Sequence, residues 1–372
     1  MPVIKDFSYP IHSSVRAFDC EIKLIDHPVL QRLRFIKQLG LAFLVFPSAQ
    51  HTRFEHSLGT MELAGRMLQL TGIKDKKIAH LLRIAGLLHD IGHGPFSHTT
   101  EVLLGDKSHE DIGVRVFYEE LSGLLKRCGY SDDELSIVSS LAFRKDASLG
   151  IPKLITGELG ADRMDYLRRD AYFCATSYGF FDYQRMLSNL HLIGNNLLGV
   201  HSSALRALES FVVGRYFMYA QVYFHKVVRI LNIHLRELLE ELFKEGKLDQ
   251  AGFHRMTDAQ VFALFLQEPN RAGVRRILFR EHFRQVFMTN SDAEFDYVRS
   301  RMLEKYGEKD LRFDIARKSV LDEDIMITNG KRTSSVRQTS DILRGLRDIA
   351  IFRIYVEPSL KEEAINFVQK LS

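Results

Sequence analysis

The chain has 372 residues, of which 45% are hydrophobic and 26% charged, so it is long enough for a large buried core and has the composition of a globular protein. A formal net charge of +4 permits anionic ligands but is too small to indicate nucleic acid by itself. Three scattered cysteines exclude a disulfide framework or a zinc ribbon and favour a reducing compartment, so we expect a cytoplasmic protein. The sequence shows no apolar signal region and no run of roughly 18 apolar residues, and we therefore expect neither secretion nor a membrane span.

After an irregular, strand-like start over residues 1–20, the chain is predicted to be helical to about residue 243. Apolar residues recur at helical spacing, and Gly or Pro interrupts them where a helix is expected to end. Asp26 is the expected N-cap of a helix with Pro28 in its first turn. Helices are expected at about residues 22–40, 53–72, 78–90, 110–125, 134–143, 155–173 and 205–243.

The pattern changes near residue 310. Asn329-Gly330 is a strong reverse-turn dipeptide, residues 349–356 form a β-branched and aromatic run typical of a strand, and a last helix is expected over residues 360–371. The predicted fold class is mainly α. We expect a large all-helical body over residues 1–230, a helical extension over 231–309 and a small C-terminal α+β lobe over 310–372.

The lobe carries several basic residues. They leave two interpretations open, a surface for an acidic partner or a solvated face, and the second is favoured because charged runs are usually solvated. These residues are Lys331, Arg332, Arg337, Arg344 and Arg347.

The segment 87–98 contains three histidines and one aspartate within ten residues. An apolar helical pattern leads into it, and Gly and Pro end that pattern, so His89 and Asp90 are expected at the end of a buried helix. Imidazole and carboxylate together suit a divalent transition metal. Because adjacent helical residues point about 100° apart, one ion bound by both needs further ligands from other elements.

Two further ligands are indicated. His56 lies on the helix that precedes His89, and short connections make consecutive helices antiparallel neighbours. Asp162, Tyr166 and Asp170 recur at i, i+4 and i+8, which places them on one stripe of a helix. This stripe is too polar for a core seam and is expected to line a cavity. The alternative is an exposed face of ion pairs with Arg163, Arg168 and Arg169.

The set His56, His89-Asp90 and Asp162 resembles the metal ligands of the HD-domain metal-dependent phosphohydrolases. Four groups of residues, in order over about the first 230 residues, resemble the deoxynucleoside-triphosphate triphosphohydrolase branch of that family. They are Leu24-Ile25-Asp26 with Gln31-Arg32-Leu33-Arg34 and Gln38-Leu39-Gly40, then Arg53 to Gly59, then His89 to His98, then Asp162 to Tyr166 with Arg169-Asp170.

The resemblance implies an HD-domain catalytic body that removes inorganic triphosphate from a deoxynucleoside triphosphate by attack at the α-phosphorus. It implies one divalent ion held by His56, His89, Asp90 and Asp162, with positions left for water and a phosphate oxygen. The ligand types admit manganese, iron, zinc, nickel or magnesium and do not name the metal. A further magnesium ion bound with the nucleotide is compatible with this chemistry.

The resemblance also assigns a second group of residues to catalysis. His98 matches the histidine that protonates the departing 5′-oxygen, and His109 and Glu101 match the residues that support it, although close relatives have an aspartate at the Glu101 position. His93 matches a phosphate-side histidine, and each histidine has a structural role as its alternative. Arg53 suits phosphate binding, and its alternative is an ion pair with Glu55 or Glu62.

The sugar and base of the substrate are matched by Gln38, Leu39, Tyr166 and Asp170. The ring of Tyr166 against the 2′-carbon would leave no room for a ribose hydroxyl. Arg163 stands where the triphosphohydrolases often have a lysine, so it keeps the charge but changes the geometry of triphosphate binding.

Relatives in this branch are often homo-oligomers regulated by a second nucleotide at a subunit interface. Asp26, Gln31 and Arg34 match residues that read guanine there, and Arg185 and Lys226 are weaker phosphate candidates. Asp26 alternatively has only its capping role.

The leading hypothesis is therefore a nucleotide phosphohydrolase. Two alternatives remain: an HD phosphohydrolase of another phosphoester, such as a nucleoside monophosphate, cyclic nucleotide or guanosine polyphosphate, and a catalytically weak nucleotide-sensing protein. Nucleic acid binding is compatible with the charge but not indicated.

Overall fold

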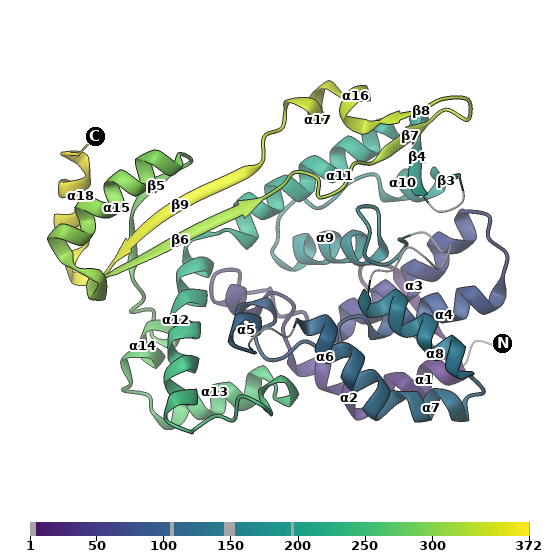
Figure 1. The fold of residues 1–372 in the computed structure, drawn as a ribbon, viewed down its shortest axis with the longest axis horizontal. Coiled ribbons are helices and arrows are strands. Elements are labelled where there is room, and N and C mark those ends of the chain that lie inside the picture. Colours follow the sequence, from purple (N-terminus) through teal and green to yellow (C-terminus); the bar gives the residue numbers. More distant parts are fainter. Residues whose placement is uncertain (1–4, 105–107, 145–152, 195–196, 372) are drawn as a thin grey trace. The chain divides into compact units, whose positions relative to one another are not determined.

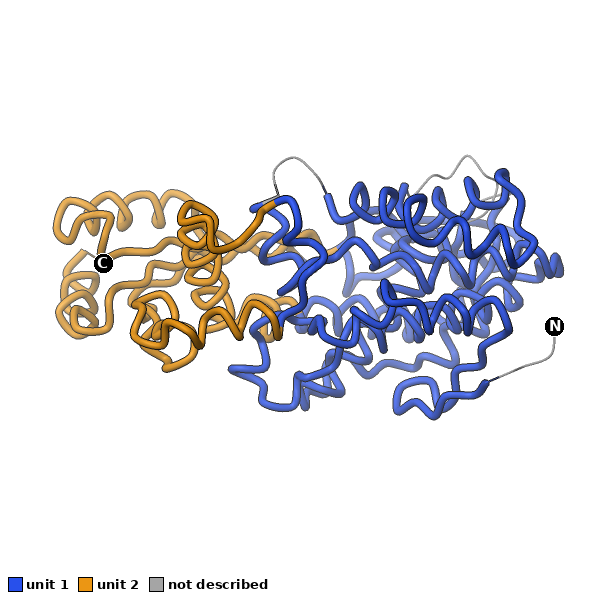
Figure 2. The backbone as a smooth tube through the Cα atoms, turned by 90° about the horizontal axis from the view of Figure 1, so that it is seen from below, with its two compact units in different colours: residues 1–218, 251–258, 321–346 blue, residues 219–250, 259–320, 347–372 orange. Residues whose placement is uncertain are grey.

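A computed structural model describes residues 5–104, 108–144, 153–194 and 197–371 of the chain (Figure 1). The protein is mainly α-helical with small sheets, which confirms the predicted fold class. It divides into two compact units, coloured separately in Figure 2. The first unit contains residues 1–218, 251–258 and 321–346, and the second contains residues 219–250, 259–320 and 347–372. Within the described residues, no helix has both the length and the apolar character that crossing a membrane requires.

The first unit is built mostly from helices. Helices α3 (Arg53–Leu70) and α4 (Lys76–Leu88) pack against each other, and α9 (Ala161–Phe173) packs against α3. Helix α3 is buried on all sides, as expected of a helix enclosed by other elements. The other helices of this unit are α1 (Asp19–Ile25), α2 (Pro28–Arg32), α5 (His98–Glu101), α6 (His109–Val116), α7 (Ser122–Arg127), α8 (Asp132–Ser139), α10 (Tyr183–Ser188), α11 (Leu205–Met218), α16 (Val336–Thr339) and α17 (Asp341–Gly345).

Local sequence fixes where α3 and α4 begin. At α3, Thr52 and Glu55 form a capping box, in which the backbone N–H of Thr52 donates to the Glu55 carboxylate. At α4, the Asp75 carboxylate accepts the backbone N–H groups of Lys77 and Ile78. These starts place residue 56 in the first turn of α3 and residue 89 directly after the last turn of α4.

A glycine on α3 allows the close approach of α9. A Cβ atom on Gly59 would lie 2.0 Å from Oδ1 of Asp165 and 2.6 Å from a guanidinium nitrogen of Arg169, both on α9. These separations are far inside van der Waals contact, so any larger residue would force the two helices apart. Gly59 therefore sets the spacing between the helix that carries His56 and the helix that carries Asp162.

Two small sheets belong to the first unit. Strands β1 (Lys5–Tyr9) and β2 (Ser13–Ala17) form an antiparallel hairpin. A four-stranded sheet has the order β3-β4-β7-β8 and is formed by β3 (Leu190–Ile193), β4 (Leu197–His201), β7 (Met326–Thr328) and β8 (Thr333–Ser335). The predicted turn at Asn329-Gly330 joins β7 to β8, with Gly330 at a φ of 83°.

The borders of the compact units differ from the boundaries expected at residues 230 and 309. The reason is a long-range pairing, because β7 runs parallel to β4 and so joins residues 321–346 to the first unit. The three-part division stays a prediction about folding domains.

The second unit has its own core between helices and a sheet. Its antiparallel sheet has the order β5-β9-β6, with β5 (Arg284–Thr289), β9 (Ile349–Val356) and β6 (Leu311–Lys318). The strand predicted over 349–356 is thus confirmed. Phe287, Phe295, Phe352 and Ile354 lie in the buried cluster that joins this sheet to its helices. The helices are α12 (Lys226–Lys244), α13 (Asp258–Gln267, whose first residue belongs to the first unit), α14 (Ala272–Leu278), α15 (Asp292–Tyr306) and α18 (Lys361–Gln369).

Four helix predictions need correction. The helix expected over 22–40 is broken, because α1 ends at Ile25, α2 covers Pro28–Arg32 and a 3₁₀ turn covers Leu33–Phe35. The long helix expected over 205–243 is interrupted, because a π-helical turn at Tyr219–Tyr223 follows α11 and α12 begins anew at Lys226. The helix expected from residue 155 begins at Ala161. Asp26 is not the N-cap of α2: it ends α1, and the ring of His27 accepts the N–H of Val29 at the start of α2.

The Gly59→Ala substitution tests the spacing of α3 and α9. We expect it to lower the free energy of unfolding by about 1–3 kcal/mol, the usual effect of overpacking a dense core. Gly123→Ala on α7 is the matched control, because the nearest atom to its Cβ lies at 3.6 Å and alanine favours a helix. Denaturant unfolding measures both variants, and equal stabilities of Gly59→Ala and the unsubstituted chain would contradict the spacing role.

Candidate metal centre

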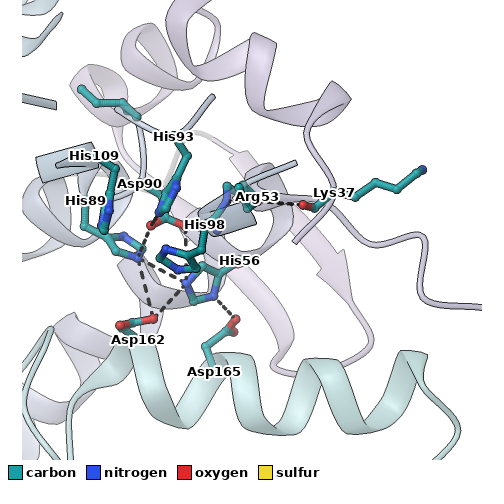
Figure 3. Close-up of polar contacts among 12 residues, drawn as sticks. Lys37, Arg53, His56, His89, Asp90, His93, His98, His109, Asp162 and Asp165 are labelled. Carbon is teal, nitrogen blue, oxygen red and sulfur yellow. Dashed lines mark hydrogen bonds and ion pairs between the residues drawn. The ribbon is translucent and has the colours of Figure 1, made fainter. Parts of the chain in front are cut away.

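The four residues predicted as metal ligands come from α3, from α9 and from the turn directly after α4, and they lie together (Figure 3). Nε2 of His56 lies 3.2 Å from Nε2 of His89 and 3.1 Å from Oδ1 of Asp162. Asp90 is adjacent, with Oδ1 at 3.3 Å from Nε2 of His89 and Oδ2 at 3.8 Å from Nε2 of His56. His56, His89 and Asp162 form a group whose ligand atoms are close enough to share one ion.

The donor set fits a divalent metal ion. Ligand atoms that share one ion at bond lengths of about 2.1 Å lie roughly 3.0–3.4 Å apart. The 3.1 and 3.2 Å separations around His56 fall in this range. Two imidazole nitrogens that face each other cannot both be neutral acceptors without an ion or a proton between them. The residues therefore fit one divalent ion, and their nitrogen and oxygen atoms do not identify the metal.

Hydrogen bonds on the far side of each ring orient the two histidines. Nδ1 of His89 donates to the carbonyl oxygen of Gly86 at 2.8 Å, and Nδ1 of His56 donates to Oδ2 of Asp165 at 2.7 Å. Each Nε2 therefore points its lone pair toward the centre. Asp165 is completely buried and also accepts hydrogen bonds from His12, at 2.6 Å, and from Arg169, at 2.7 and 2.8 Å.

The electrostatics of the centre favour a cation. Burial lowers the pKa of His56, but hydrogen bonds to Asp162 and Asp165 outweigh burial and raise it to about 10. Burial raises the pKa of Asp90, but the charge of Arg53 and the nearby histidines hold it well below its usual value. Burial raises the pKa of Asp162, but its hydrogen bond with His56 outweighs burial and lowers it. The carboxylates of Asp90 and Asp162 therefore remain ionised and favour a proton on His56 when no ion is bound, and a divalent ion would replace that proton.

Arg53 lies in the wall of this centre. It is 2% exposed, its guanidinium pairs with Oδ2 of Asp90 at 2.5 Å, and its Nε donates to the hydroxyl of Ser97 at 2.8 Å. The alternative pairings of Arg53 are wrong, because Glu55 caps α3 and Glu62 pairs with Arg83.

The second predicted group, His93, His98, Glu101 and His109, also comes together. Oε1 of Glu101 accepts from Nδ1 of His109 at 2.7 Å, and Oε2 lies 3.1 Å from Nδ1 of His98. The longer side chain of Glu101 therefore reaches both histidines. Burial raises the pKa of the Glu101 carboxyl, but these hydrogen bonds outweigh burial and hold it well below its usual value. A glycine makes room for His109, because a Cβ on Gly92 would lie 1.9 Å from its carbonyl oxygen.

The three histidines of this second group are close enough to suggest another ion site, but their ring geometry disfavours it. The rings of His93 and His109 stack with centroids 4.0 Å apart and planes 16° apart. An imidazole binds a metal in the plane of its ring, and one ion cannot lie in both of two stacked planes. The group instead fits proton transfer and anion binding. Burial and Arg53 hold the pKa of His93 well below its usual value, so its ring is neutral at pH 7.

A cavity of about 200 Å³ joins the two groups. This volume admits a phosphate group or several water molecules. His98 lines it with a side chain that is 67% exposed, whereas Arg53 and the ligand histidines are buried. Its lining residues are Gln38, Arg53, His56, His89, Asp90, His93, His98, His109, Glu110, Ala142, Thr156, Asp162, Arg163 and Tyr166.

Of the residues predicted to contact the substrate, Leu39 and Asp170 do not line the cavity, and Arg163 is already ion-paired. Leu39 is outside the lining set. Asp170 is buried farther along α9 and its carboxylate contacts Nε2 of His51 at 2.8 Å. Arg163 lines the cavity, but its guanidinium pairs with Glu158 at 2.7 Å and with Asp322 at 2.8 Å. The predicted stripe on α9 is therefore split, because Asp162 and Tyr166 face the cavity and Asp170 does not line it.

The alternative of an exposed ion-paired face on α9 is wrong in part. Arg169 is completely buried against Asp165, and the Arg168 guanidinium lies 4.0 Å from the centre of the Tyr183 ring.

The predicted effector residues fall in both units. In the first, Gln31 donates to the carbonyl of Ile25 at 2.7 Å, Arg34 donates to the Gln31 side chain at 2.8 Å, and Asp26 is exposed. Arg185 donates to the carbonyl of Ser203 at 2.7 Å. In the second unit, Lys226 lines a cavity of about 230 Å³. The other basic residues of this cavity are Arg280, His282, Arg284 and Lys361.

Two protein-family models match this chain. Residues 53–170 match the HD domain, and residues 181–347 match the HD associated region. An uncharacterized protein of Methanocaldococcus jannaschii is 33% identical over 325 residues, which cover 82% of this chain and 67% of that protein. The chain belongs to the HD-domain family.

A solved structure shares the whole fold. This hypothetical protein from Aquifex aeolicus has a TM-score of 0.89 and 44% identity, and the match covers 97% of this chain and 99% of the other. A SAMHD1 homolog of Dictyostelium discoideum, a deoxynucleoside triphosphate triphosphohydrolase, is 28% identical over 352 residues. That match covers 86% of this chain but 66% of the Dictyostelium protein, so the chain spans about two thirds of the length of these two curated relatives. The chain thus resembles the triphosphohydrolase branch of the HD-domain family.

Two residues support the centre in ways that the sequence did not reveal. Asp165 supports His56, and His12, outside the matched segment, supports Asp165. The sequence signal for Asp165 was its spacing from Asp162 and Arg169, because positions i, i+3 and i+7 lie on one face of a helix. For His12 the sequence held no signal, because it contacts a residue 153 positions away.

Metal binding is expected to strengthen as pH rises. The pKa of His56 in the metal-free chain is about 10, so the ion displaces one proton at every pH below that value. Between pH 6.5 and 8.5 the dissociation constant for manganese is expected to fall about tenfold per pH unit, because one bound proton changes the equilibrium by this factor. Competition with a metal chelator measures this dissociation constant at each pH. A pH-independent constant would contradict proton displacement from His56.

Proposed function

We propose that the chain is a metal-dependent nucleotide phosphohydrolase that hydrolyses deoxynucleoside triphosphates to a deoxynucleoside and inorganic triphosphate. The observation that supports this most directly is that one cavity joins the ligand group of His56, His89 and Asp162 to a potential acid, His98. The likeness to the Dictyostelium triphosphohydrolase supports the substrate class.

The reaction needs a water, a charged phosphorus centre and a proton for the leaving group. The water oxygen bonds to the α-phosphorus, the bond from phosphorus to the 5′-oxygen breaks, and the 5′-oxygen takes up a proton. A bound divalent ion would acidify the water and neutralise charge on the phosphoryl oxygens. His56, His89, Asp90 and Asp162 would hold this ion.

His98 is proposed as the proton donor. Its Nδ1 lies 3.1 Å from Oε2 of Glu101, so this nitrogen carries its hydrogen toward Glu101 and Nε2 is left for the leaving 5′-oxygen. The Glu101 carboxylate also stabilises the protonated imidazole, because it stays ionised over the whole neutral range. His109, bonded to the other oxygen of Glu101, keeps that carboxylate in place.

Positive and neutral donors in the same wall are proposed to bind phosphate. Arg53 lies beside the cavity and pairs with Asp90, so its charge acts both on the ligand carboxylate and on a phosphate in the cavity. His93 lines the same cavity, and its Nε2 lies 3.4 Å from Oδ1 of Asp90, which places this nitrogen where it could contact a phosphate oxygen. Tyr166 and Gln38, also in the lining, are proposed to contact the sugar and base, with Leu39 and Asp170 as outlying candidates.

One observation favours a smaller phosphoester as the alternative substrate. The guanidinium of Arg163 is already paired with Glu158 and Asp322, which reduces the charge that it can offer to a triphosphate. A nucleoside monophosphate or cyclic nucleotide would need less positive charge.

A regulatory nucleotide and a homo-oligomer are further parts of the proposal. The basic cavity around Lys226 supports an anionic effector, since four of its lining residues are Lys or Arg. Asp26, Gln31, Arg34 and Arg185 are the other candidates for its binding.

Product analysis tests the proposal. We expect a mixed panel of nucleotides with manganese, iron, zinc, nickel or magnesium to yield deoxynucleosides and inorganic triphosphate, resolved by mass. In ¹⁸O-labelled water the label is expected in the triphosphate, because attack at phosphorus leaves the 5′-oxygen with the sugar. Orthophosphate as the product would support the alternative phosphoester reaction. A metal-loaded chain without turnover of any nucleotide or phosphoester would support a sensing protein.

The His98→Ala variant tests the acid. It is expected to keep the metal, because His98 lies outside the ligand group, and to lose roughly 10²–10⁴-fold in kcat, the usual contribution of a general acid. His191→Ala, an exposed histidine on β3, is the control. Full turnover by His98→Ala with natural nucleotides would show that another group protonates the leaving oxygen.

A further inference from the structure

The loop that leads to His98 has an unusual backbone. Phe96 and Ser97 have φ values of 59° and 57°, so two consecutive residues other than glycine adopt positive φ. Such a backbone is strained for a residue other than glycine and persists only where its surroundings hold it. The same Ser97 is the N-cap of α5, whose first residue is His98. The bonds that hold this loop therefore decide where the imidazole of His98 lies.

A carboxylate from a distant part of the chain holds the loop. Oδ1 of Asp258 accepts the backbone N–H of Phe96 at 2.8 Å, and Oδ2 accepts the backbone N–H of Lys37 at 2.9 Å. Asp258 is 3% exposed and lies in the HD associated region, 162 positions beyond Phe96. Buried carboxylates are costly unless hydrogen-bonded, and both of its oxygens have such a partner.

The Asp258 carboxylate joins two segments of the cavity wall. The hydroxyl of Ser97 donates to the carbonyl of Lys37 at 3.0 Å, so residue 37 is bonded through its N–H to Asp258 and through its carbonyl to Ser97. Arg53 donates to the same hydroxyl. Gln38, the next residue, lines the cavity. One side chain thus fixes the segment with Gln38 against the segment with His98.

We infer that Asp258 is a positioning residue of the active site, which places His98 for proton transfer by holding the strained backbone at Phe96 and Ser97. The inference rests on the proposed function. The metal ligands lie on α3, α9 and at the end of α4, and they are not bonded to Asp258. Loss of the carboxylate is therefore expected to affect proton donation and to spare metal binding. Displacement by about 1 Å is enough to lower a rate about 100-fold.

The test is a double-mutant cycle with Asp258→Asn and His98→Ala. Asparagine keeps the shape but has one acceptor oxygen, so one backbone N–H loses its partner. We expect Asp258→Asn to lower kcat for the deoxynucleotide roughly 10- to 100-fold, to change KM less than threefold and to leave the manganese content at that of the unsubstituted chain. In the His98→Ala background the same substitution is expected to change kcat less than twofold, because the group that it positions is gone.

Asp75→Asn is the matched control. Asp75 also accepts two backbone N–H groups, but at the start of α4, and its substitution is expected to leave kcat unchanged. Equal losses of kcat from Asp258→Asn in both backgrounds, loss of metal, or failure to fold would show a general structural role and overturn the inference. Unchanged kcat in the single variant would overturn it as well. An unsubstituted chain that is inactive on nucleotides would instead refute the proposed function, so the two failures are distinguishable.

Discussion

The buried carboxylate of Asp165 is the interaction on which the centre depends. It accepts hydrogen bonds from three sources, the ring of His12 after β1, the ring of His56 on α3 and the guanidinium of Arg169 on its own helix. A carboxylate without solvent contact is stable only when such donors surround it, and removal of one donor leaves a buried charge without compensation. The same bonds that stabilise the first unit therefore orient the Nε2 atom of His56.

The two halves of the cavity differ in how they are supported. The proposed ligands lie on α3, on α9 and directly after α4; α3 packs against both α4 and α9, and Gly59 allows the close approach of α9. His98 stands on the single turn of α5, after a strained loop, and its side chain is largely exposed. The proposed ion site is thus enclosed by packed helices, whereas the proposed acid lies on a short and more exposed element.

Much of the centre could be predicted from the sequence, because its residues lie in short motifs. His89 and Asp90 mark the end of an apolar helix pattern, and His56 lies on the helix before it. Asp165 could not be assigned in the same way, since its role follows from the crossing of α3 and α9 rather than from local spacing. Arg169 was open to the opposite interpretation, an exposed face, because periodicity does not show which side of α9 is covered.

Long-range pairings limited the prediction of the fold. The mainly helical class and the strand at 349–356 follow from residue patterns that act locally. The parallel pairing of β4 with β7 joins residues more than 120 positions apart, and no local pattern signals it. The break between α11 and α12 is also unmarked, because the residues at the π-helical turn are as apolar and aromatic as those of a continuous helix.

The central claim is that His56, His89, Asp90 and Asp162 surround one ion. Anomalous diffraction from a crystal of the chain loaded with manganese tests it most directly. The account predicts a single strong peak in the first unit, within bonding distance of Nε2 of His56, Nε2 of His89 and one oxygen each of Asp90 and Asp162. A peak among His93, His98 and His109 in place of that position, or manganese bound only at the surface, would contradict the account.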